Sequence, residues 1–209
     1  LIFIYMNKFI VSLSLLLCVG VFQSSFGQNR TDVRIENDVF SVSYNETLEQ
    51  PNWVEYEVRD IVKNFDRGSM DFYVPKGVYT SNSDDYKNNV WDKGHMAPAA
   101  AFTDTKENLK TTFSYLNCSL QFDKLNRGAW RELEAQEREW AKRYGTLQVR
   151  IVLNFEPGHE VLPTGGHVPN GYWKYITFPN GDKECFYFPN STPTKHWSEY
   201  EIQCQVKRR

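Results

Sequence analysis

The sequence lacks an excess of positive charge. Lys and Arg number 24 against 26 Asp and Glu, and the formal net charge is −2. Proteins that bind nucleic acid tightly through phosphate contacts are usually basic. The composition therefore argues against a protein that holds a nucleic acid over its whole surface, and leaves open an enzyme that must release its substrate.

Internal repeats, low-complexity tracts and a convincing linker are also missing from the 209 residues. This length suits one mixed domain with a core of its own. Hydrophobic residues make up 41% and aromatic residues 15% of the chain. A composition of this kind favours strands around a buried core over intrinsic disorder.

Long apolar runs are scarce, since residues 9–22 form the one candidate. The run follows Met6 and Lys8 and precedes small residues, which is typical of a secretory signal peptide. We expect residues 1–27 to be this signal, with Met6 as the true start, and residues 28–209 to be a single exported domain, secreted or periplasmic. A membrane anchor is less favoured because the run is short, and a lipoprotein would require acylation of Cys18. No membrane partner is expected.

Cysteine is infrequent, with four residues in the chain. Cys18 would leave with the signal, and the other three lack the spacing of a zinc site. Because export permits disulfides, we expect Cys185 to pair with Cys204 and Cys118 to stay free.

Alternating and helical patterns predict an α+β fold with an antiparallel sheet. Residues 125–144 have apolar positions at helical spacing, and Gly145 would end that helix. Polar or Gly/Pro-rich loops are expected at residues 81–89 and 156–170. Strands are expected at residues 39–44, 53–58, 147–155, 171–178, 185–188 and 201–206.

The segment most suggestive of chemistry is residues 91–99, Trp-Asp-Lys-Gly-His-Met-Ala-Pro-Ala. A lone histidine is usually structural, and His159, His167 and His196 are interpreted in that way. His95 differs because Asn117, Asn126 and Glu134 follow it at intervals.

Asn126 and Glu134 both fall within the predicted helix, where side chains lean toward the N-terminus. They could share one hydrated ion, with Asn126 bound directly and Glu134 through water. Magnesium suits this arrangement because it keeps most of its waters. From spacing alone, an Asn126 helix cap and a solvated Glu134 are the more favoured interpretation.

The residues 92–99 also resemble the Asp-Arg-Gly-His signature of the DNA/RNA non-specific endonucleases. Residues 117–121, Asn-Cys-Ser-Leu-Gln, resemble the family's Asn-x-Ser-Pro-Gln segment, and residues 126–134 resemble its metal-binding helix. Residues 168–174 are similar to the strand that follows. The resemblance extends from about residue 44 to residue 203.

This resemblance implies a ββα-metal fold and a set of roles. His95 would be the general base that activates water, and Asn126 would bind Mg2+, with Mn2+ or another divalent ion as a substitute. Glu134 would hold a metal-bound water, and Asn117 would be an accessory residue of the site. Arg67 loosely matches an upstream arginine that contacts phosphate.

Two positions depart from the family pattern. Lys93 stands where the family has arginine, so the charge is kept but the planar, bidentate contact with phosphate is lost. Leu120 replaces the family's proline and would alter the turn after Asn117.

The expected reaction is hydrolysis of phosphodiester bonds in DNA and RNA, leaving 5′-phosphates. A neutral imidazole can accept a proton from water, and one metal can stabilise the leaving oxygen. None of these groups reads a base, which predicts cleavage that ignores sequence. A homodimer and a protein inhibitor are left open.

Two other functions compete with this one. The first is a catalytically impaired protein on the same fold that binds nucleic acid or a partner. The second is a phosphatase or narrow phosphodiesterase, which usually needs two metals held by several Asp and His. The sequence has no such cluster.

Overall fold

The structure, a computed structural model, describes residues 29–204. The predicted export signal at residues 1–27 lies outside this range. Within it, no helix is both long enough and apolar enough to cross a bilayer.

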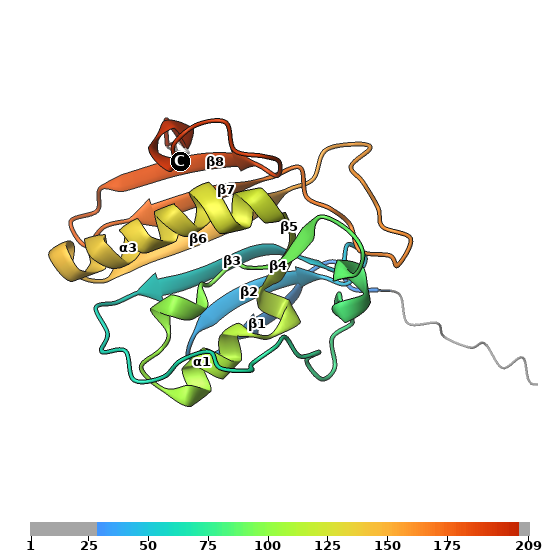
Figure 1. Ribbon diagram of the computed structural model, residues 1–209, viewed down its shortest axis with the longest axis horizontal. Helices are drawn as coiled ribbons and strands as arrows, with labels where there is room; N and C mark the ends of the chain where they lie inside the picture. Colours follow the sequence, from blue (N-terminus) through green and yellow to red (C-terminus); the bar gives the residue numbers. More distant parts are fainter. Residues whose placement is uncertain (1–28, 205–209) are drawn as a thin grey trace, which may run out of the picture.

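A seven-stranded antiparallel sheet forms the body of the molecule (Figure 1). Its strands lie in the order β1-β2-β3-β6-β7-β8-β9, so most neighbours in space are also neighbours in the chain. The bounds are β1 Val33–Glu36, β2 Phe40–Asn45, β3 Gln50–Val58, β6 Leu147–Asn154, β7 Gly171–Thr177, β8 Lys183–Pro189 and β9 Glu201–Ile202. The predicted strands are confirmed to within a few residues at most ends; β1 was not predicted, and β9 stops well before residue 206.

Alternation along the central strands places the core on one side of the sheet. In β6, Leu147, Val149 and Ile151 are buried while Gln148 is exposed between them. This matches the period of two that a half-buried strand requires. Helix α3, Arg131–Tyr144, packs against β3 and β6 and crosses the face of the sheet in Figure 1.

The helix predicted over residues 125–144 is not continuous, and this part of the prediction was wrong. A short turn, α2 at Asp123–Leu125, leads into a wider π-helical turn, η4 at Asn126–Trp130, before α3 begins. Gly128 departs from helical geometry, with φ −108° and ψ −118°. Glycine reaches this conformation because it has no Cβ. Asn126 therefore lies before the break and Glu134 lies after it.

A second sheet has two strands, β4, Trp91–His95, and β5, Cys118–Phe122, and its β5 packs next to β3. Between β4 and β5 lie the short helix α1, Lys106–Thr112, and the 3-10 turns η2, Ala99–Ala101, and η3, Tyr115–Asn117. Two further 3-10 turns are η1, Ser83–Tyr86, within a predicted loop, and η5, Trp197–Tyr200.

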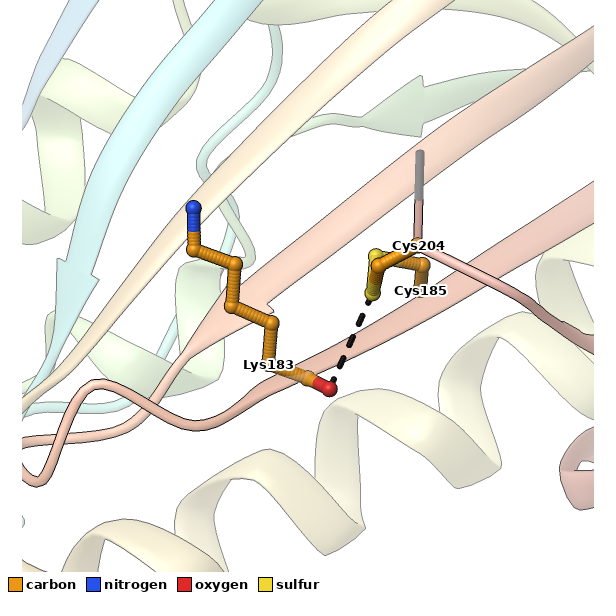
Figure 2. The surroundings of a disulfide bond; sticks show 3 residues. All are labelled: Lys183, Cys185 and Cys204. Atoms are coloured by element: carbon orange, nitrogen blue, oxygen red, sulfur yellow. Dashed lines mark hydrogen bonds between the residues drawn. A yellow bond between two sulfur atoms is a disulfide. The ribbon is translucent and has the colours of Figure 1, made fainter. Parts of the chain in front are cut away.

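The predicted C-terminal end of α3 and the predicted disulfide are both confirmed. Gly145 ends α3 with φ +99°, and its N–H donates to the Ala141 carbonyl at 3.0 Å. Cys185 is bonded to Cys204, as expected, and Cys118 is buried and free. Figure 2 shows the disulfide beside the Lys183 carbonyl, where it ties the segment after β9 to β8.

Candidate active site

The β4–β5 pair forms the floor of the site. Its register sets His95 opposite Cys118 and Gly94 opposite Ser119. A Cβ on Gly94 would lie 2.4 Å from Oε1 of Gln121, so the Lys-Gly-His segment needs glycine at this position. The strand can then bring His95 to its end, next to the loop that begins at Met96.

The imidazole of His95 lies between two aromatic rings. Its centroid is 4.5 Å from that of Phe72 and 4.8 Å from that of Phe113. Nε2 is buried and has no hydrogen-bond partner. Burial, followed by the charge of Arg67, lowers the pKa of His95 to about 3, so the ring is neutral at physiological pH. Because Nε2 is enclosed, a reactant reaches it only if a neighbouring ring moves; otherwise proton transfer uses Nδ1.

Both predicted phosphate-binding cations lie around this histidine. The guanidinium of Arg67 stands 5.0 Å from the Phe113 ring centroid and donates Nε to the Met70 carbonyl at 3.3 Å. Lys93 forms an ion pair with Asp71, with Nζ and Oδ1 2.8 Å apart. No pattern in the sequence indicated Asp71, whose carboxylate offsets part of the charge that Lys93 brings.

Asn117 is fully buried beneath the segment that follows His95. Its Oδ1 accepts from the Ala97 N–H at 2.7 Å. Its Nδ2 donates to the carbonyls of Ala97 at 2.8 Å and Thr112 at 2.9 Å. Both ends of the amide are thus bonded to main chain, and the arrangement suits a residue that positions the backbone after His95.

Asn126 is linked to the strand that carries His95. Its Nδ2 donates to Oδ2 of Asp92 at 2.9 Å, across from β4 to the start of the helical segment. The same carboxylate accepts from Arg127, through Nε at 2.8 Å and Nη2 at 2.5 Å. Asp92 therefore fixes which way the Asn126 amide faces. The amide oxygen of Asn126 is the end left to bind a cation.

Glu134 lies one helical turn after Trp130, near the charged side chains of Lys174, Glu137 and Arg138. Burial raises the pKa of Glu134 to about 7, while the nearby ammonium of Lys174 acts in the opposite direction. Arg138, one turn later, donates Nη1 to the Glu134 carbonyl at 2.9 Å. In the sequence, the spacing of four residues on one helix was the signal that could have identified Arg138 as a neighbour of Glu134.

The other three histidines have local partners. Nε2 of His159 and Nδ1 of His167 are 2.7 Å apart within the loop before β7. Nδ1 of His196 caps the turn that begins at Trp197. These bonds agree with the structural interpretation given to each of them.

Comparison with known proteins identifies the family and the fold. The sequence profile described as DNA/RNA non-specific endonuclease matches residues 20–209. Nuclease C1 of Cunninghamella echinulata is 28% identical over 171 residues, which cover 73% of this chain and 68% of that protein. A nuclease of Nostoc is 28% identical over 141 residues, and the match spans 66% of this chain but 51% of the relative.

The fold also matches a solved structure. EndoG, from a crystal structure of the EndoG/EndoGI complex, superposes with a TM-score of 0.75 at 24% identity, over 85% of this chain and 82% of that one. This confirms the predicted α+β, ββα-metal architecture. With its sequence profile matched from residue 20 to residue 209, the chain belongs to the DNA/RNA non-specific endonuclease family, whose members are nucleases.

Proposed function

We propose that this protein is an exported, divalent-metal-dependent endonuclease that hydrolyses DNA and RNA without regard to sequence. The observation that carries the proposal is the bond between Asp92 on β4 and Asn126 at the start of the helical segment. It connects the strand of the proposed base to the residue proposed to bind the metal.

The donors suit a hard cation. Asn126 offers an amide oxygen whose orientation is set by Asp92, and Glu134 would reach the ion through a water molecule. Magnesium prefers oxygen ligands and keeps several waters, and Mn2+ accepts the same donors. When bound, the metal would neutralise charge on the phosphate and stabilise the leaving oxygen.

The remaining residues have roles that follow from their surroundings. His95, neutral at physiological pH, would take a proton from the attacking water. Arg67 and Lys93 would contact the phosphate, with Lys93 first released from Asp71. Asn117 would hold the backbone after His95 in place. These contacts address phosphate and main chain only, which is why base identity would not matter.

Export rests on two separate features. Residues 1–27 have the pattern of a signal peptide, and the disulfide between Cys185 and Cys204 suits an oxidising compartment. Secreted and periplasmic destinations both fit these features. A homodimer and a protein inhibitor stay predictions.

The proposal is tested by incubating the purified protein with supercoiled plasmid and with total RNA, in magnesium or in EDTA. We expect degradation of both substrates in magnesium alone. His95→Ala should abolish it, while His159→Ala, a matched histidine away from the site, should not. A folded protein that cleaves neither substrate with any of several divalent metals would refute the nuclease and favour the impaired binding protein.

A further inference from the structure

Two carboxylates are buried in loops that lie close to Leu120 on β5. Glu49, in the turn between β2 and β3, is 4% exposed, and Asp85, in η1, is not exposed at all. Oε2 of Glu49 and Oδ1 of Asp85 are buried without a hydrogen-bond partner. An ionised carboxylate in such a place is costly unless something offsets its charge.

A glycine pair in the loop before β7 lies directly against these acids. A Cβ on Gly165 would come within 2.6 Å of Oε1 of Glu49, and one on Gly166 within 3.3 Å of Oδ1 of Asp85. The loop backbone therefore passes close to both carboxylates, where larger residues would not fit. The loop is held there by the His167 N–H, which donates to the Leu48 carbonyl at 3.0 Å.

The electrostatic surroundings are acidic. The pKa of Glu49 is raised to about 7, first by burial and then by the negative charge of Asp85. The nearby basic side chains have other partners: Arg30 pairs with Glu46, and Lys87 pairs with Asp84. The two acids thus have no basic residue to balance them in the part of the chain that the structure describes.

We propose that Glu49 and Asp85 bind a structural calcium ion between the β2–β3 turn, η1 and the loop that carries Gly165 and Gly166. The two acids and the neighbouring Tyr79 hydroxyl are oxygen donors, and main-chain carbonyls and water would complete the shell. Oxygen-only coordination in irregular loops suits Ca2+ better than Mg2+, which demands a near-ideal octahedron. Across residues 29–204 no three His, Cys, Asp or Glu side chains gather into a metal cluster, so backbone ligands are required.

The site would brace the strands that carry the proposed catalytic residues. The side chain of Leu120, on β5, lies 3.1 Å from the Cβ position of Gly166. Leu120 is also paired with Lys93 on β4. A cation that fixes the glycine loop would therefore support the β4–β5 pair through Leu120, without taking part in catalysis.

Thermal unfolding of the purified protein, first in EDTA and then with increasing Ca2+, tests the site. We expect Tm to rise with the logarithm of the calcium concentration, by about 5–10 °C at calcium one hundred times above Kd. The rise should persist in Asn126→Ala, which removes the proposed catalytic ion, and in Asp84→Asn, an exposed neighbour. It should be lost in Asp85→Asn and Glu49→Gln, both isosteric with the native residues.

Two results would overturn the proposal. A calcium effect that disappears in Asn126→Ala would assign it to the catalytic site. An absent calcium effect, with Tm rising in EDTA as pH falls from 8 to 6, would mean that the two acids share a proton instead. If a carboxylate variant fails to fold, calorimetric titration of Asn126→Ala with Ca2+ still decides, since the proposal requires one bound ion and its absence refutes it.

Discussion

The ammonium of Lys174 on β7 and the carboxylate of Glu137 on α3 lie 2.5 Å apart, and neither side chain has any exposed surface. The Tyr56 hydroxyl donates to Glu137 at 3.2 Å, and the same ammonium stands 4.3 Å from the Trp130 ring centroid. One buried cation thus joins the sheet to the helix that carries Glu134.

Lys174→Met should destabilise the protein strongly, because it leaves the Glu137 carboxylate buried without a counter-charge. We expect a loss of about 3–5 kcal/mol in the free energy of unfolding, measured with urea. Adding Glu137→Leu should recover most of it, since an apolar pair of similar size removes the unpaired charge. Lys142→Met, which breaks an exposed pair with Glu139, should cost less than about 1 kcal/mol. If Lys174→Met lowered the free energy of unfolding as little as Lys142→Met does, the buried pair would not have this stabilising role.

Asn117→Ala should also be costly, since it strips three bonds from buried main-chain groups. Each buried polar group left unpaired costs about 1–3 kcal/mol, so Tm should fall and nuclease activity should drop in the folded fraction. Asn64→Ala, which loses one exposed bond to the Asp104 carbonyl, serves as the control. Equal Tm values for the two variants would show that Asn117 does not hold the segment after His95.

Asp92→Ala should raise the magnesium concentration needed for half-maximal activity. Groups that orient a metal ligand typically contribute about 10–100-fold to affinity, and Asp92 orients Asn126. Arg127→Ala removes the exposed partner of the same carboxylate and should shift the requirement little. The measurement is the initial rate of plasmid cleavage against Mg2+. An unchanged requirement in Asp92→Ala would disprove the orienting role.

The pH dependence of stability should carry the signature of His95. Its pKa is about 3 in the folded protein and about 6.5 when unfolded, so the unfolded chain binds the extra proton between these values. The stabilisation that comes from keeping His95 neutral is therefore fully present above pH 6.5 and is lost as the pH falls toward 3. The stability gap between wild type and His95→Gln should narrow by at least about 1 kcal/mol from pH 7 to pH 5. A gap that stays constant would contradict the lowered pKa.

Much of the sheet could be predicted, because alternation in strands such as β6 is local and strong. The break at Gly128 could not, since an isolated glycine is tolerated in many helices. Lys174 appeared only as one polar residue in an aromatic strand, and its partner Glu137 as one of several helix acids. Their pairing depends on how α3 packs on the sheet, and no local pattern in the sequence indicates that packing.

The candidate site was predicted as a set of residues but not as an arrangement. His95, Asn117 and Asn126 were identified from their spacing and from the family resemblance. That Asp92 joins β4 to Asn126, and that Phe72 covers the His95 ring, follow from contacts between segments far apart in the sequence. Short-range patterns cannot reveal such contacts.

In the proposed mechanism, His95 performs proton transfer while Asn126 binds the metal. Initial rates of plasmid cleavage against Mg2+ for wild type, His95→Ala and Asn126→Ala test it most directly. We predict that His95→Ala lowers the maximal rate by about 100-fold or more without changing the half-activating Mg2+. Asn126→Ala should instead shift that concentration upward. A His95→Ala protein that cleaves at the wild-type rate would contradict the account.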